Sequence, residues 1–320
     1  MKLRILLASS LCVMMIAIGA GSAVAHGLAG KRFFPATLVV DDPFVADELS
    51  LPSFSHIKKP AKGKDEPPTR ETEVEGEFSK SITPNFGLSV KGGLTSLDPD
   101  DKPTLGGPGN LELGLKYQFF KSATHETILS LGLGWEVGGT GRKATEAESF
   151  DVFNPALFFG KGFGDLPEAL HYLKPLAVTG VVGGKLPNRK WTKTVKVEGD
   201  EVEVEVERHP NVFQWGIVIE YSLPYLQSFV KDVGLPAPFS RMIPVVELNF
   251  EHPLDRGMAG KNTGTVNPGI IWAGKFIQIG LEAIFPINDR TSKNVGVRGM
   301  LHFFLDDLFP TSLGRPVFGR

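Results

Sequence analysis

The residues of this chain whose types and spacing could support catalysis are its histidines. His125-Glu126-Thr127 places a hydroxyl group two residues after an imidazole. Lipid hydrolysis by a histidine-activated hydroxyl commonly uses the spacing His-x-Ser, for which threonine is a poor substitute. No histidine in the sequence has a serine two places further on. The motif therefore does not indicate a hydrolase.

Two other histidine arrangements suggest different chemistry. His209, His252 and Asp255 could gather as the acidic and imidazole groups of a protease, although exposed loop histidines are far more often inert. His26 could chelate copper through its amine and imidazole if it were an N-terminus, as in the soluble copper-dependent polysaccharide monooxygenases. Those enzymes use a second histidine, and spacing identifies none here. A soluble β-sandwich with copper at His26 is kept as a remote alternative.

The remaining motifs and the composition exclude several function classes. The sequence has no glycine-rich phosphate loop, no HExxH and no paired cysteines. Its 320 residues carry a formal net charge of −2, which argues against nucleic acid as a partner. We therefore predict no enzymatic activity, no cofactor and no metal site beyond the remote copper alternative.

The first 25 residues have the pattern of a secretory signal peptide. Lys2 and Arg4 form a basic start, residues 6–20 are largely apolar, and Ala23-Val24-Ala25 is a small-residue cleavage site. Cleavage would leave His26 as the first residue and would remove Cys12, the one cysteine. We therefore predict an exported protein that folds without disulfides.

The remaining chain is predicted to cross a membrane with strands. After residue 25, no stretch approaches the ~20 apolar residues that a spanning helix requires. Short segments instead alternate apolar and polar residues, as in 109–120, where Leu111, Leu113 and Leu115 share one face. Such segments recur at 49–57, 71–81, 85–95, 109–120, 125–137, 150–161, 174–185, 211–222, 241–251, 265–274, 275–285 and 293–305.

This pattern predicts an antiparallel transmembrane β-barrel of about 12 strands, with 10 to 14 possible, over residues 49–305. A soluble β-sandwich or lipocalin-like barrel also alternates. The polar face here mixes glycine, serine and charges with little to fill a core, and short and long connections alternate, as in bacterial outer-membrane barrels. Residues 26–48 are predicted to form an irregular periplasmic segment or a partial plug, and 306–320 a C-terminal tail. Outer-membrane lipid is the expected surrounding.

The polar face supplies the candidate functional residues. On the predicted inner face, carboxylates outnumber cations, and an acidic pore attracts cations and repels anions. Some of these groups could instead pair in an occluded polar core, because small barrels fill their interiors with side chains. The predicted lumen-lining residues are Glu73, Glu75, Glu77, Glu112, Glu136, Glu220, Glu247, Glu251, Glu282, Lys91, Lys116 and Arg298.

These features predict a passive channel or transporter-like protein for small organic solutes or cations. A non-conducting structural or binding barrel is the alternative. Replacing Glu112, Glu220 and Glu282 by glutamine should reduce the cation selectivity of a conducting form.

The signal sequence, the strand pattern and the segment 153–164, Phe-Asn-Pro-Ala-Leu-Phe-Phe-Gly-Lys-Gly-Phe-Gly, resemble those of a known group. The chain is similar in style to proteobacterial outer-membrane proteins of the phenol-degradation (MetA-pathway) transporter family. That resemblance covers most of the chain after residue 25. It implies a barrel that passes or binds small organic molecules, and it brings no catalytic residues with it.

Overall fold

The structure is a computed structural model that describes residues 27–61, 67–198 and 201–319, with the side chains of 194–205 excepted. The predicted signal peptide and the copper hypothesis at His26 lie outside the described residues. Among the helices that are described, none has the length and apolar character needed to cross a bilayer.

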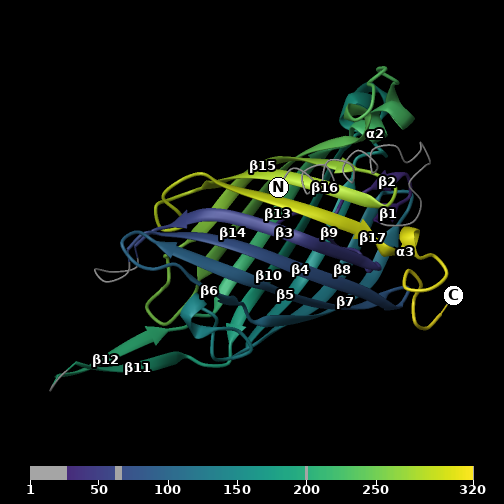
Figure 1. Cartoon of the computed structure of the whole chain (residues 1–320). Coiled ribbons are helices and arrows are strands. Elements are labelled where there is room, and N and C mark those ends of the chain that lie inside the picture. The colour runs from purple at the N-terminus through teal and green to yellow at the C-terminus, as the bar shows by residue number, and fades with distance from the viewer. Residues whose placement is uncertain (1–26, 62–66, 199–200, 320) are drawn as a thin grey trace, which may run out of the picture.

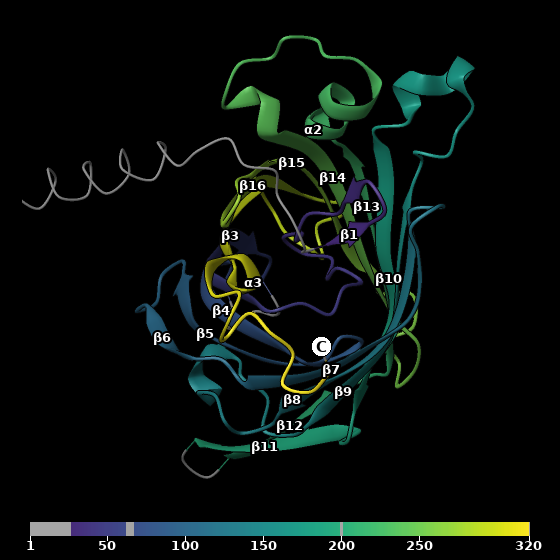
Figure 2. The same cartoon turned by 90° about the vertical axis from the view of Figure 1, so that its right-hand side faces the viewer.

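Twelve long strands form a closed antiparallel β-barrel, which confirms the predicted fold class (Figures 1 and 2). Each strand pairs with its sequence neighbours in the barrel, and the last strand closes the ring on the first, with Gly299 opposite Phe54. The barrel strands are β3 (Glu48–Lys59), β4 (Thr69–Thr83), β5 (Phe86–Pro99), β7 (Leu111–Ser122), β8 (Thr127–Val137), β9 (Val152–Gly162), β10 (Leu176–Pro187), β13 (Val212–Tyr221), β14 (Met242–Pro253), β15 (Thr263–Ala273), β16 (Ile277–Pro286) and β17 (Gly296–Phe304).

Alternation along the strands places most large exposed apolar side chains on the outside and most polar ones on the inside. In β16, Ile279 and Leu281 are 48% and 52% exposed, whereas Gln278 and Glu282 are buried. Large aliphatic side chains left open on an outer wall suit contact with lipid, and polar side chains on the inner wall suit a solvated lumen. The inner wall therefore holds the groups that can act on a solute.

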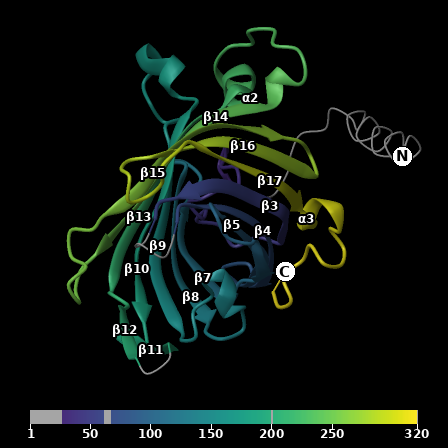
Figure 3. The same ribbon diagram turned by 60° about the vertical axis from the view of Figure 1, so that its left-hand side comes forward.

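The two ends of the barrel carry different elements (Figures 1 and 3). One end, here the hairpin end, bears the separate hairpin β11 (Trp191–Glu198) and β12 (Glu201–Arg208). The short strand β6 (Leu105–Pro108) extends the sheet beside β5, and the 3₁₀ helix η1 (Lys143–Thr145) lies against it.

The opposite end, here the α2 end, bears the small β1–β2 sheet and the short helices. Its elements are β1 (Leu28–Ala29), β2 (Arg32–Phe33), the 3₁₀ helix η2 (Glu168–Leu173), α2 (Leu223–Tyr225), the π-helix η3 (Leu226–Val230), the 3₁₀ helix η4 (Phe239–Arg241) and α3 (Leu305–Leu308).

Candidate functional site

Residues 27–47, here the plug segment, enter the barrel and run through its interior. In the end-on view, the purple trace of this segment lies within the ring of strands (Figure 2). Its side chains complete two buried apolar clusters with the inner wall, one around Phe34 and Ile128 and the other around Val40 and Ile243. The lumen is therefore partly filled by the chain's own N-terminal segment.

Glycines on the inner wall make room for the plug segment. A Cβ atom built on Gly216 would lie 2.6 Å from Cγ2 of Val40, and one on Gly280 would lie 2.6 Å from Cδ1 of Leu38. Real Cβ atoms do not approach other carbons so closely, so a side chain at Gly216 or Gly280 would force Val40 or Leu38 of the plug segment to shift. These glycines belong to the polar face of the alternation, which mixes glycine, serine and charged residues.

At the α2 end, Arg32 ties the plug segment to the barrel rim. Its side chain is fully buried, and Nε lies 3.2 Å from Oε2 of Glu126, while Nη1 donates to the carbonyl of Pro175 at 2.9 Å. The guanidinium carbon also lies 3.9 Å from the ring centre of Tyr225. A buried ion pair needs such additional partners to offset the loss of hydration.

Tyr225 completes this anchor from α2. Its hydroxyl donates to Oε1 of Glu126 at 3.0 Å, and the amide of Gly164 donates to Oε2 at 3.0 Å. Burial, together with the charge of Glu126, raises the pKa of Tyr225 to about 12. The hydroxyl therefore stays protonated at neutral pH and keeps its role as a donor.

A second anchor lies deeper in the lumen at Glu247 of β14. One carboxylate oxygen accepts the amide of Leu38 at 2.7 Å, and the other accepts the amides of Val39 and Val40 at 2.9 Å each. The side-chain amide of Gln278 donates to the carbonyl of Ala36 at 2.5 Å. The wall thus supplies hydrogen-bond partners for the backbone of an irregular segment that pairs with no strand there.

We expect Glu247→Gln to loosen the plug segment, because the variant loses the charge and one of the two acceptor oxygens. Hydrogen bonds to charged groups contribute about 1.5–3 kcal/mol each, so the opening free energy of residues 38–40 should fall by about that amount. Amide hydrogen exchange of these three residues measures the change. Glu251→Gln, four residues further along β14 and paired instead with Lys185, is the matched control. Equal exchange in both variants would remove Glu247 as an anchor.

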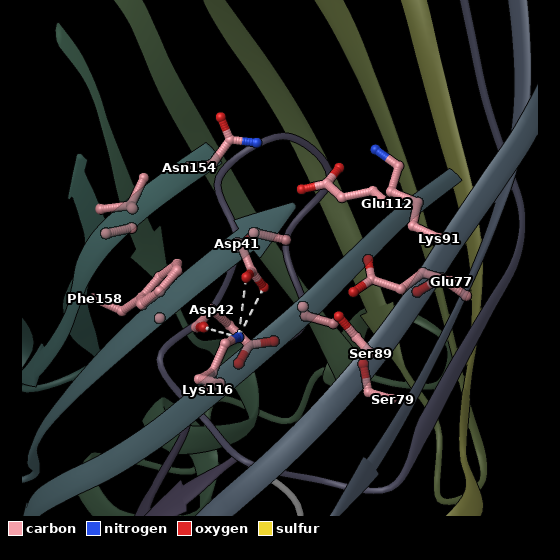
Figure 4. A pocket seen from close by; sticks show the side chains of 18 of the residues that line it. Asp41, Asp42, Glu77, Ser79, Ser89, Lys91, Glu112, Lys116, Asn154 and Phe158 are labelled. Atoms are coloured by element: carbon pink, nitrogen blue, oxygen red, sulfur yellow. Dashed lines mark hydrogen bonds and ion pairs between the residues drawn. The ribbon is translucent and has the colours of Figure 1, made fainter. Parts of the chain in front are cut away.

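Beside the plug segment, the lumen keeps a polar cavity of about 410 Å³. Figure 4 shows Glu77, Lys91, Glu112 and Lys116 around it, with Asp41 of the plug segment facing Lys116. These wall residues come from β4, β5 and β7, on the side of the barrel away from the Glu247 anchor. The plug segment and the inner wall therefore form the cavity together.

The predicted lumen residues fall into two groups. Six of them line the cavity, namely Glu75, Glu77, Glu112, Glu136, Lys91 and Lys116. The others lie elsewhere on the inner wall. Glu220, Glu247 and Glu282 are buried, and Arg298 is opposite Glu282 in the β16–β17 register. Glu73 accepts a hydrogen bond from Ser55 at 3.4 Å, and Glu251 pairs with Lys185 at 2.6 Å.

Sequence reasoning missed the contribution of the plug segment to the cavity. Asp41 lies 3.0 Å from Nζ of Lys116, and Asp42 also lines the space. Lys185 was missed as well, although its position in β10 opposite Val212 follows the same alternation as the other inward residues. The run Asp41-Asp42-Pro43 carries charge but no periodicity, so its only signal was composition.

Each cavity lysine lies close to a carboxylate. Nζ of Lys91 lies 3.0 Å from Glu75, Lys185 pairs with Glu251, and Lys116 pairs with Asp41. Among the described residues that line the cavity, seven carry a carboxyl group and three are lysines. The lining thus keeps an excess of carboxyl groups after its lysines are matched.

The candidate catalytic histidines are engaged with different partners. The imidazole of His125 lies 3.1 Å from Asp165, while the hydroxyl of Thr127 donates to the backbone carbonyl of His125 rather than to a ring nitrogen. In the second group, His209 bonds to Thr192, His252 to the indole of Trp215, and Asp255 to Asn211. No hydrogen bond among the described residues links His209, His252 and Asp255 to one another.

Neither protein-family models nor the sequences of curated proteins match this chain. Solved structures do match its fold. An outer-membrane channel described as COG4313 from Pseudomonas putida F1 is 12% identical, with a TM-score of 0.54, over 81% of this chain and 95% of that one. The NanC porin, with a TM-score of 0.44 and 10% identity, covers 79% of this chain and 98% of its own. The likeness to the COG4313 channel shows that the chain has the fold of outer-membrane β-barrels.

Proposed function

We propose that this protein is an outer-membrane channel for small solutes, with a path that runs between the plug segment and strands β4 to β9. The cavity beside the plug segment is the observation that carries the proposal. Its volume of about 410 Å³ falls within the range of roughly 300–1,000 Å³ that holds small molecules. The solutes are small organic molecules or cations, and the surrounding lipid contacts the apolar outer wall.

The charge of the lining supports a preference for cations. Carboxyl groups exceed lysines around the cavity, and Glu77 and Glu112 face it from neighbouring parts of the wall (Figure 4). Carboxylates along a narrow passage lower the energy of a cation and raise that of an anion. The low-dielectric wall strengthens both effects relative to open water.

We expect the double variant Glu77→Gln and Glu112→Gln to lower cation selectivity, because it removes two charges from the path without changing side-chain size. The reversal potential in a salt gradient across a planar bilayer measures this selectivity. The potential should move toward zero relative to the intact protein.

Glu220→Gln is the control, since this carboxyl group is buried in the wall outside the cavity lining. This variant should shift the reversal potential less than either Glu77→Gln or Glu112→Gln alone. An equal or larger shift from Glu220→Gln would place the path elsewhere in the lumen.

A non-conducting binding barrel is the second candidate function, and the two anchors of the plug segment favour it. In that case the cavity would hold a solute and release it to the same side. The two functions separate in proteoliposomes: a channel lets a small cation equilibrate across the vesicle wall, whereas a binding barrel retains the gradient.

A further inference from the structure

Three potential metal ligands converge at the hairpin end of the barrel, away from the lumen cavity. Glu148 lies in the β8–β9 connection, Glu207 near the end of β12, and His209 just after it. One ligand atom from each residue lies within 4.8 Å of those of the other two. The cluster therefore joins the base of the β11–β12 hairpin to a neighbouring loop.

The imidazole of His209 is buried and held in place. Only 6% of the residue is exposed, and Phe150 packs against the ring with a centroid distance of 4.2 Å. The hydroxyl of Thr192 lies 3.1 Å from Nε2. Metal-binding histidines characteristically have one ring nitrogen fixed by a hydrogen bond, which leaves the other for the metal. In His209 the other ring nitrogen is Nδ1.

The charge state of the cluster suits a cation. Two of its three ligand groups are the carboxylates of Glu148 and Glu207, which attract a cation. Arg256 donates to the backbone carbonyl of His209 and lies 3.7 Å from Asp255, so its charge is partly matched outside the cluster.

The loop that carries Glu148 is itself held by the barrel. The backbone carbonyl of Glu148 accepts the side-chain amide of Asn110 at 2.9 Å and the amide of Gly139 at 2.8 Å. Asn110 precedes β7, so the carboxylate is presented from a backbone tied to two strands. A cation that ligated Glu148 would thus be connected to the barrel wall.

We propose that Glu148, Glu207 and His209 form a binding site for a divalent transition metal such as Zn²⁺, which clamps the β11–β12 hairpin to the β8–β9 loop. One imidazole and two carboxylates are ligands that Zn²⁺ accepts, whereas Ca²⁺ takes oxygen ligands. Ligand atoms around tetrahedral Zn²⁺ lie about 3.4 Å apart, so rotations of the two glutamates bring the cluster to that spacing. The fourth position is open to water.

Such a clamp would give the hairpin an attachment that its own pairing lacks. β11 and β12 form a two-stranded sheet separate from the barrel sheet. Isolated hairpins have marginal stability in water, and a metal that binds only the docked arrangement stabilises that arrangement. The hairpin should therefore be held more firmly when Zn²⁺ is present.

Isothermal titration of the full detergent-purified protein with Zn²⁺ tests the site. We expect one Zn²⁺ per chain, with affinity reduced at least about tenfold by His209→Ala or Glu207→Gln and similarly by Thr192→Val, which removes the bond to Nε2. Glu146→Gln, in the same loop but outside the cluster, is the matched control and should bind as the intact protein does. Ca²⁺ should bind much more weakly than Zn²⁺.

A second measurement distinguishes loss of metal binding from a disturbance of the loops that is unrelated to a metal. Zn²⁺ should slow trypsin cleavage after Lys190 and Arg208, which flank the hairpin, in the intact protein and in Glu146→Gln but not in His209→Ala. Absence of Zn²⁺ binding, binding that all the variants retain, or equal binding of Ca²⁺ that survives loss of His209 would each overturn the proposal.

Discussion

Deletion of residues 27–46 is expected to raise the single-channel conductance several-fold while the barrel stays closed. These residues fill the part of the lumen next to Glu247, and barrel closure depends on strand pairing that begins at Glu48. The deletion stops before Asp47 because its carboxylate accepts from Lys80 and Ser81 of β4 and so supports the barrel rim. Conductance of single channels in a planar bilayer measures the effect.

The control for this deletion is the state of the barrel itself. Closed barrels resist detergent, so an unboiled sample should migrate faster than a boiled one on a gel for both the intact and the shortened chain. A shortened chain that passes this control and conducts no better than the intact protein would show that the plug segment does not restrict the path.

Arg32→Ala is expected to release the α2-end anchor of the plug segment. The substitution leaves the carboxylate of Glu126 buried without its cation, and breaking a buried pair in this way costs about 3–5 kcal/mol. We expect this free energy to be lost from docking of the plug segment and not from the barrel, because the hydrogen bonds between the barrel strands are unchanged. Hydrogen exchange of the amides around Arg32, among them Phe34, which bonds to Gly27 at 2.9 Å, measures the docking free energy.

Lys31→Ala is the matched control, because Lys31 is the exposed neighbour in sequence and contacts only the ring of Phe229 among the interactions described for it. The variant should leave exchange of the plug segment nearly unchanged. If Arg32→Ala and Lys31→Ala have equal effects, the Arg32–Glu126 pair does not hold the plug segment.

The barrel could be predicted from the sequence because the alternation that indicates it lies within each strand. β16 alternates without interruption, β7 does so up to a bulge after Gln118, and each of the twelve predicted segments overlaps one barrel strand. Successive side chains of a pleated strand point to opposite faces. In a wall with lipid outside and a polar lumen inside, apolar and polar residues therefore alternate along the sequence.

The lining of the cavity could be predicted in part, from the same alternation within strands. Inward positions in strands, including Glu77, Glu112 and Lys116, follow from alternation alone. The division between cavity residues and buried residues such as Glu220 depends on where the plug segment lies. That segment is irregular, and its position is set by hydrogen bonds to Glu247 and by two wall glycines that are distant in sequence.

The cluster at the hairpin end shows where sequence reasoning reaches its limit. His209 was singled out with His252 and Asp255 because all three fall in long connections between predicted strands. The structure instead brings His209 beside Glu148, which lies 61 residues earlier in the chain. Long loops carry no periodicity, so the contacts between them are set by tertiary structure alone.

The reversal potential of the intact protein in a gradient of potassium chloride tests the central claim most directly. An acidic path beside the plug segment predicts discrete conductance steps and a potential with the sign of potassium movement down its gradient. A protein that passes the gel-mobility control but gives no steps, or a potential at zero or of the opposite sign, would contradict the proposal of a cation-preferring channel.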